Sequence, residues 1–437
     1  MRVLSKSLFV LLLVGSATLN IIAILPFGLA QSGTNVSGLI SSDTIWTKLG
    51  SPYIFTAPVG ISANATLTIE SGVTINLNSY YLQINGNLQA IGSSTDPISF
   101  QGTTIPYSSE IRFIKNNSNQ PITPTSTIEN AILNISLVRA YNETVKLNSN
   151  TIYCSVNLGS RYGIITRNVF YGTSNFALIA GAPVIWNNTF SCSNSAIEVG
   201  YDDYGMPMIV ANTIKGTGAK DGYAIWGGSA NVSDNIITNW DTGIDLAGNT
   251  EIKNNWIYNN TIGVTRQWNT NCVIQNNTIE NNTIAINVPQ SSTIINFNNI
   301  LNNAKYSIYM HTTGNINATY NWWGTTDVNS INPTTYDNKN DFNLGKIDIS
   351  PILNESNSQA MPNSNVPMTI MLLPSSYVSP TLSPTQTPIL SPSLPPSETP
   401  TSTPAVPELS CLVILPLLLS VFSVAAVFRH RNQVKKP

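Results

Sequence analysis

The sequence contains few charged residues. Only 10% of its 437 residues are Asp, Glu, Lys or Arg, whereas about a quarter is usual in soluble domains. It has just 2 His, which leaves little material for a zinc or copper site. No extended basic face is visible, so nucleic acid is not expected as a partner. No cofactor is predicted, with Ca²⁺ as the only alternative.

Asparagine supplies the polarity that charge does not. The chain has 55 Asn, about one residue in eight, together with 17 Tyr and 8 Trp. A chain of this length would suggest two or three globular domains, but repeat architectures break that rule. The sequence was therefore searched for internal periodicity.

Both ends of the chain are apolar. Arg2 and Lys6 precede an apolar run over residues 8–29, which predicts a secretory signal peptide over 1–30 or, alternatively, an uncleaved anchor. Residues 409–428 are long and apolar enough for a transmembrane helix, and the basic tail 429–437 predicts a cytoplasmic C-terminus. The segment between them is then extracellular. It is mildly acidic, with 14 Lys and Arg against 22 Asp and Glu over 31–408.

A Pro/Ser/Thr-rich stalk is predicted over 374–408, after a linker over 353–373. Proline recurs every fourth residue from Pro380 to Pro404, a pattern typical of an extended polyproline-like spacer. Val406-Pro407-Glu408, the apolar run and the basic tail resemble the sorting signal that archaeosortases recognise on archaeal surface proteins. That signal usually reads Pro-Glu-Phe, whereas Leu409 follows here. A plain membrane anchor is the alternative.

A repeat of about 22 residues occupies the middle of the chain. An Asn followed two residues later by an apolar residue recurs at spacings of 20 to 24 residues, at positions 168, 188, 212, 235, 255, 277, 298 and 321. Short apolar pairs precede and follow each Asn, so every repeat predicts three short strands that alternate with period two. Such units must stack to close a core. Asn tolerates a left-handed turn conformation and, repeated at one position, forms amide ladders.

The repeat resembles right-handed parallel β-helix proteins of the pectate-lyase-like group that are common on archaeal and bacterial surfaces. The resemblance rests on the entry segment 65–75, on Leu82-Gln83-Ile84-Asn85-Gly86 and on the closing segment 321–327. It implies an all-β fold over 52–352, after a lead-in over 31–51. At 22 residues per coil, roughly thirteen coils are expected. Trp322 and Trp323 are expected to cap the last coil, with sugar stacking as the alternative.

Three cysteines lie in the extracellular part, Cys154, Cys192 and Cys272. Cys154 and Cys192 are nearly two coils apart, beyond the reach of a disulfide. All three are therefore expected to be buried thiols. Twelve N-x-S/T sequons are present. The predicted glycosylation sites are Asn64, Asn134, Asn142, Asn231, Asn259 and Asn317, whereas Asn187 and Asn276 lie next to ladder positions and are expected to be false matches.

Catalysis has to be tested because this fold often carries polysaccharide-degrading enzymes. Of the polygalacturonase-like residue pattern only Asp202-Asp203 is present, and the arginine pattern of the lyases is missing. His311 beside Met310 could touch a metal.

Aligning coils by their inward pairs places Glu198, Trp226 and Asp245 in one outward column. Two carboxylates about 9–10 Å apart are near the upper limit for an inverting glycosidase, so Glu198 and Asp245 are the catalytic candidates. Alternatively, Asp202 and Asp203 could hold Ca²⁺. Trp226, Tyr201 and Tyr204 could also stack on sugar. A fourth reading leaves these acids as solvated surface.

Four function classes remain open from the sequence. The leading one is a membrane-anchored surface glycoprotein, non-enzymatic, that binds surface polysaccharide or other envelope components, or acts in adhesion. The second is a tethered polysaccharide lyase or glycoside hydrolase. The third is a structural envelope component without a ligand. The sequence does not fix the oligomeric state.

Overall fold

The computed structural model describes residues 33–367, except 115–124, 142, 160–162, 173–176, 182–183, 201–205, 218–221, 267–270, 290–291 and 364. The signal peptide, stalk, transmembrane helix and basic tail expected from the sequence lie outside the described residues. Within the described part of the chain, no helix is long and apolar enough to cross a membrane.

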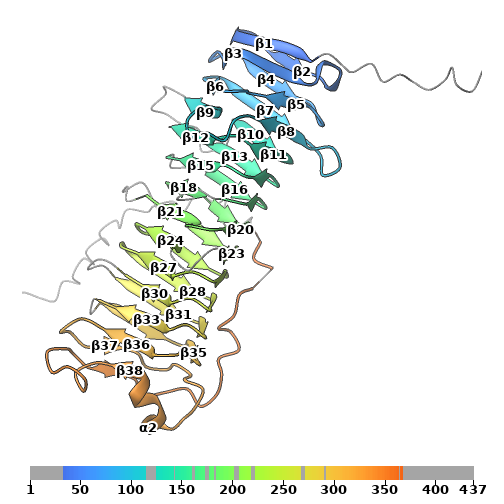
Figure 1. Ribbon diagram of the computed structural model, residues 1–437. Coiled ribbons are helices and arrows are strands. Elements are labelled where there is room, and N and C mark those ends of the chain that lie inside the picture. Colours follow the sequence, from blue (N-terminus) through green and yellow to red (C-terminus); the bar gives the residue numbers. More distant parts are fainter. Residues whose placement is uncertain are drawn as a thin grey trace, which may run out of the picture. The chain divides into compact units, whose positions relative to one another are not determined.

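The described chain is a right-handed parallel β-solenoid with almost no helix (Figure 1). Its strands form one parallel sheet of 14 strands and a second of 25, counted over the described residues. The 14-stranded sheet, called sheet B here, contains β2 (Thr44–Trp46), β4 (Thr66–Ile69), β7 (Asn87–Ile91), β10 (Ser126–Glu129), β13 (Val145–Asn148), β16 (Gly163–Thr166), β19 (Val184–Trp186), β22 (Met208–Val210), β25 (Asn231–Ser233), β28 (Thr250–Lys253), β31 (Cys272–Gln275), β34 (Thr293–Asn296), β37 (Ile316–Asn317) and β39 (Ile347–Asp348).

The 25-stranded sheet consists of two columns joined by the long strands β1 (Thr34–Ile40) and β3 (Tyr53–Ile61). Column A1 contains β5 (Thr74–Asn76), β8 (Ile98–Gln101), β11 (Ala131–Asn134), β14 (Thr151–Ile152), β17 (Val169–Phe170), β20 (Thr189–Cys192), β23 (Thr213–Gly216), β26 (Ile236–Thr238), β29 (Trp256–Tyr258), β32 (Thr278–Glu280) and β35 (Asn299–Leu301). Column A2 contains β6 (Tyr81–Ile84), β9 (Glu110–Ile114), β12 (Leu137–Tyr141), β15 (Ser155–Leu158), β18 (Leu178–Ala180), β21 (Ile197–Val199), β24 (Tyr223–Gly227), β27 (Thr242–Leu246), β30 (Ile262–Thr265), β33 (Ile284–Val288), β36 (Tyr306–Met310) and β38 (Thr335–Tyr336).

The number of coils differs from the expected thirteen. Turns that contain one strand of each column run from β4–β5–β6 to β34–β35–β36, which makes about 11 complete turns among the described residues. Two features explain the difference. One turn is long, because Gln89 pairs with Thr127, 38 residues later. The ends are incomplete turns, and the first strands, β1 and β2, already lie within the segment expected as a lead-in.

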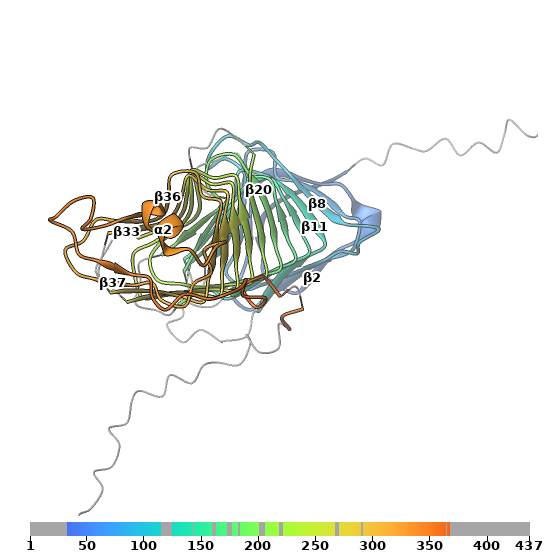
Figure 2. The ribbon, with the colours of Figure 1, turned by 90° about the horizontal axis from the view of Figure 1, so that it is seen from below.

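The core is a stack of aligned apolar side chains, visible when the solenoid is viewed from its end (Figure 2). Ile214, Ile237 and Ile257 occupy the same register position on successive strands and are each 0% exposed. Phe170 and Phe190 stack in the same way, with ring centroids 4.5 Å apart. Each such side chain contributes about 1.5–3 kcal/mol by burial, so stacking supplies the core that one turn lacks.

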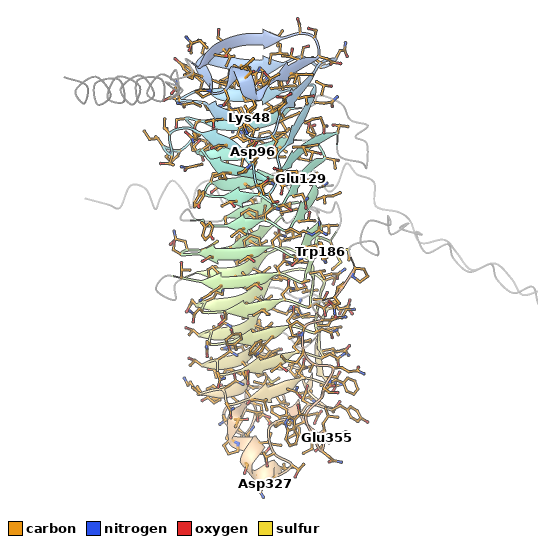
Figure 3. The ribbon with its side chains drawn as sticks, turned by 90° about the vertical axis from the view of Figure 1, so that its right-hand side faces the viewer. Lys48, Asp96, Glu129, Trp186, Asp327 and Glu355 are labelled. Atoms are coloured by element: carbon orange, nitrogen blue, oxygen red, sulfur yellow. The ribbon has the colours of Figure 1, made fainter. Side chains whose placement is uncertain are left out.

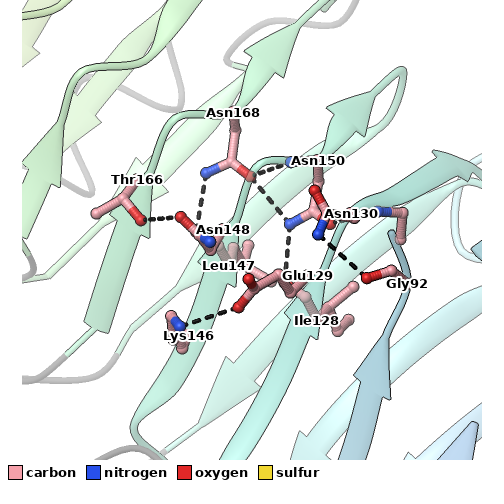
Figure 4. A network of polar contacts seen from close by, with 11 residues as sticks. Gly92, Ile128, Glu129, Asn130, Lys146, Leu147, Asn148, Asn150, Thr166 and Asn168 are labelled. Carbon is pink, nitrogen blue, oxygen red and sulfur yellow. Dashed lines mark hydrogen bonds and ion pairs between the residues drawn. The ribbon is translucent and has the colours of Figure 1, made fainter. Parts of the chain in front are cut away.

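The repeated asparagines form a buried ladder at the corner between sheet B and column A1. The backbone N–H and Nδ2 of each Asn donate to Oδ1 of the Asn one turn further on, as from Asn212 to Asn235 at 2.9 and 3.0 Å. The start of the ladder, Asn150 to Asn168, is drawn in Figure 4. The left-handed conformation falls on the preceding residue rather than on the ladder Asn, for example at Ala211 with φ 56° and at Asp234 with φ 57°.

A second, shorter ladder was not expected. The backbone N–H of Trp240 donates to Oδ1 of Asn260, and Asn260, Asn282 and Asn303 continue the same pattern. The signal in the sequence is the pair of Asn-Asn dipeptides five residues apart, 254–255 and 259–260, which recurs one turn later.

The C-terminal end carries a small cap. After β37, the helix α2 (Val328–Ile331) and the 3₁₀ turn η2 (Asn332–Thr334) fold over the last turns; another 3₁₀ turn, η1 (Lys48–Gly50), lies at the N-terminal end. Trp323 is 8% exposed and packs in the core, as its expected capping role requires. Trp322 forms an isolated parallel bridge to Asn299.

The chain then turns back along the outside of the solenoid. Residues 353–367, called the strap here, run from the capped end past successive turns towards Trp186 (Figures 1 and 3). Thr278 donates through Oγ1 to the carbonyl of Ala360 at 2.5 Å. Trp186 donates through Nε1 to the carbonyl of Val366 at 3.1 Å, across 180 residues of sequence. The described chain therefore leaves the solenoid beside β19 and not at its capped end.

Candidate ligand-binding face

The outward column predicted from the sequence is present on A2. Glu198 of β21 pairs in register with Trp226 of β24, which pairs with Asp245 of β27. Their neighbours Ile197 and Ile225 are buried, so period-two alternation sends the named side chains outward. Two strand spacings separate the carboxylate-bearing backbones, about 9–10 Å. The alignment of these three residues is confirmed.

The two carboxylates differ in environment. Asp245 is 5% exposed, whereas Glu198 is half-buried. Burial raises the pKa of Glu198 above its ordinary value. Beside them, the ring of Tyr223 lies 6.2 Å from that of Trp226. Burial, followed by the charges of Asp245 and Asp241, raises the pKa of Tyr223.

This arrangement has two chemical uses. A carboxyl with a raised pKa stays protonated to higher pH and suits a general acid, while an indole flanked by polar groups suits stacking on a sugar ring. The spacing of the carboxylates leaves room for an inverting water.

The remaining candidates cannot be placed on this face. Tyr201, Asp202, Asp203 and Tyr204 lie outside the described residues, so the Ca²⁺ and stacking roles expected for them stay predictions. Among the residues that the structure does describe, no group of three or more His, Cys, Asp or Glu side chains is close enough to hold a metal ion.

His311 and Met310 do not form a metal site together. Met310 is 0% exposed in the core, while His311 is exposed and packs edge-on against Tyr309 with centroids 4.5 Å apart. Adjacent strand residues point to opposite faces, which separates the two side chains.

An aromatic cluster at the end of the same column was missed from the sequence. Tyr309 stacks on Tyr306 at 5.0 Å and packs on Tyr336 at 4.6 Å. Burial raises the pKa of Tyr336. The signal for β36 was its alternation, Tyr306-Ser307-Ile308-Tyr309-Met310, but Tyr336 comes from β38 in the cap, whose position no repeat indicated.

The predicted glycosylation sites are distributed over several turns. Asn64, Asn134, Asn259 and Asn317 are exposed, and Asn231 is half-buried. Asn142 lies outside the described residues. Asn276 accepts a hydrogen bond from Nδ2 of Asn357 in the strap at 3.0 Å, which fits the expectation that it is not a glycan site. Asn187, also expected to be a false match, is exposed.

The three extracellular cysteines are free and buried, as expected. Burial raises the pKa of Cys154 to about 12 and that of Cys192 to about 11. These thiols are therefore inert fillers of the core and not nucleophiles.

Comparison with known proteins agrees with the fold. Residues 197–345, about a third of the chain, match the family described as right handed beta helix region. The matched segment contains β21, β24 and β27 and hence the whole candidate column. No curated protein and no solved structure matches the chain. The chain is thus similar to right-handed β-helix proteins, a class that by itself does not specify an activity.

Proposed function

We propose that this protein is an extracellular, membrane-anchored β-helix glycoprotein that binds a surface glycan through the A2 face, in adhesion or in the cell envelope. The observation that carries the proposal is the register of Glu198, Trp226 and Asp245 on adjacent strands. It offers one aromatic platform between two hydrogen-bond acceptors, which is the chemistry that a sugar ring requires.

Export is proposed from sequence features at the two ends. The apolar run 8–29, the Pro/Ser/Thr segment 374–408 and the run 409–428 support secretion followed by anchoring. Mass spectrometry of the mature protein tests this: an N-terminus at Gln31 and glycan on Asn64 or Asn134 are expected. A mature chain that retains Met1 and carries no glycan would contradict it.

Glycan binding is tested with a glycan array and two tryptophan variants. Trp226→Ala is expected to weaken binding about tenfold, because it removes the stacking surface. Trp256→Ala is the matched control, since Trp256 is also outward and half-buried but lies on β29 in column A1. Equal binding by both variants would exclude Trp226 as the platform.

Polysaccharide cleavage is the second candidate, favoured by the raised pKa of Glu198. Glu198 would be the general acid and Asp245 the base in an inverting hydrolysis. The assay is reducing-sugar release from uronate, xylan and glucan substrates. Turnover that Glu198→Gln abolishes would establish the enzyme and overturn the binding-only proposal.

The third candidate, an envelope component without a ligand, predicts no array signal and regular tiling of copies on the cell surface. Electron microscopy of isolated envelopes distinguishes it from the first two.

A further inference from the structure

A second polar cluster lies on the A2 face, three strands from Glu198. It is centred on Glu110 at the start of β9, whose side chain is 0% exposed. Oε2 of Glu110 accepts from Nε of Arg112 at 2.5 Å and is 2.7 Å from Nη2 of Arg139. One buried carboxylate oxygen therefore fixes two arginines.

The two arginines are direct neighbours across strands. Arg112 of β9 and Arg139 of β12 occupy the same register position, about 4.8 Å apart along the solenoid. Like charges at such positions are destabilising unless a counter-charge lies between them. Glu110 supplies one negative charge against two positive ones, so the cluster retains a net charge of about +1. On an extracellular segment that is acidic as a whole, this local positive charge needs an explanation.

The cluster is also held rigidly. The guanidinium of Arg112 lies 3.9 Å from the centroid of the Tyr81 ring, and that of Arg139 lies 5.7 Å from the Tyr141 ring. A guanidinium that is stacked and ion-paired has little conformational entropy left to lose when it binds a ligand.

Hydrogen-bonding capacity remains unused. Arg112 spends only Nε on Glu110, and within the described residues its Nη1 and Nη2 have no partner. Nε of Arg139 is buried, also without a partner in the described part of the chain. Both arginine side chains are 21% exposed, so solvent reaches them. Planar groups of N–H donors with one excess positive charge match a carboxylate or sulfate.

The register of A2 connects this cluster to the candidate column. From Arg139 the outward position continues through Asn157 and Ile179 to Glu198, about 14–15 Å along the face. A polymer with a negative charge on every sugar would bring charge against Glu198 and Asp245. A polymer with charged and neutral sugars in alternation can place an acid group on the arginines and a neutral ring on Trp226.

We propose that Arg112 and Arg139, positioned by Glu110, form an anion subsite for the carboxylate or sulfate of a mixed acidic and neutral glycan. The proposal rests on the proposed glycan-binding function and adds the charge class of the ligand. It also assigns polarity to the A2 face, with the acid group towards the N-terminal turns and the neutral sugar towards Trp226.

The test measures binding of the full-length chain to three polymers at low and high salt. Hyaluronan has alternating acidic and neutral sugars, polygalacturonate is acidic throughout, and dextran is neutral. Hyaluronan is expected to bind most tightly, and added salt should weaken it because the contact is ionic. Chondroitin with and without sulfate then distinguishes a sulfate from a carboxylate as the bound group.

Variants isolate the arginines. Arg112→Gln is expected to weaken hyaluronan binding about tenfold or more, and Arg112→Lys to lose part of it because the planar fork is absent. Lys253→Gln is the control, since Lys253 is also a partly exposed cation paired with a carboxylate, that of Glu251, but on sheet B. Equal weakening by Lys253→Gln would overturn the proposal in favour of general electrostatics.

A measurement on the unmodified chain covers the case in which the variants do not fold. Phenylglyoxal modification of Arg112, followed by mass spectrometry, is expected to slow in the presence of hyaluronan but not of dextran. No protection overturns the anion subsite. If hyaluronan fails to bind while a neutral glycan still binds through Trp226, only this inference fails; if no glycan binds, the proposed function fails as well.

Discussion

At the scale of single residues, the ladder asparagines satisfy backbone groups that the tight corners would otherwise leave buried and unpaired. Asn235 is 0% exposed, accepts two hydrogen bonds from Asn212 and donates through Nδ2 to the carbonyl of Ile209. Left-handed backbone at the preceding residue turns the chain, so the ladder Asn points inward. Asn is used because its amide both donates and accepts.

Asn235→Ala is therefore expected to lower the free energy of unfolding by about 3 kcal/mol or more. It leaves two buried donors of Asn212 unpaired, at about 1–3 kcal/mol each. Urea unfolding measures the effect. Asn271→Ala, at an exposed position, is the control and should change stability by less than about 0.5 kcal/mol. Equal effects of the two substitutions would refute a structural ladder.

The buried cysteines give a pH-dependent prediction. With the pKa of Cys192 and Cys272 raised to about 11, the thiolate fraction at pH 8 is only about a thousandth. Maleimide labelling of the native chain should therefore be very slow, should rise with pH, and should become fast in urea. Fast labelling of Cys192 at pH 8 without denaturant would show that these turns open.

At the scale of elements, the strap is the one segment that the repeat did not predict. It binds by reading groups that the corners expose: Asn363 donates its backbone N–H to Oδ1 of Asp234 at 3.0 Å. Val366 packs on a small outer apolar cluster formed by Trp186 and Val210, which is separate from the main core. The strap thus covers the corner beside sheet B, and none of its printed contacts is with the A2 face.

Val366→Asp is expected to detach the end of the strap, because it buries a charge against Trp186. Hydrogen exchange at the Trp186 indole and proteolysis within 353–367 should both accelerate, while the unfolding midpoint of the solenoid stays unchanged. Asn365→Asp adds the same charge at an exposed neighbour and should leave both rates as they are. A lowered midpoint for Val366→Asp would make the strap part of the cooperative core.

At the scale of the whole solenoid, stability and solubility depend on closing its ends. The last turns are covered by Trp323, α2 and η2, which keep the edge of the sheets from pairing with another copy. Outward positions along the solenoid are not equivalent, and the A2 face combines the arginine subsite, the Trp226 platform and the Tyr309 cluster in one line.

Trp323→Asp is expected to expose the terminal core and cause end-to-end association. Size-exclusion chromatography with light scattering should show concentration-dependent oligomers, whereas Trp256→Ala, which removes an outward tryptophan, should not change the oligomeric state. An unaltered elution profile for Trp323→Asp would mean that α2 and η2 close the end without it.

The sequence by itself determined the repeat, the parallel β-helix and the alignment of Glu198, Trp226 and Asp245. Each of these follows from a local period of two within strands and of about 22 between turns, which any stacked chain must satisfy. Only the tertiary structure decided the number of complete turns, the shared salt bridge at Glu110 and the course of the strap. Those features depend on contacts between residues with no common period: Arg112 meets Arg139 across an irregular loop, and Val366 reaches Trp186 from 180 residues away.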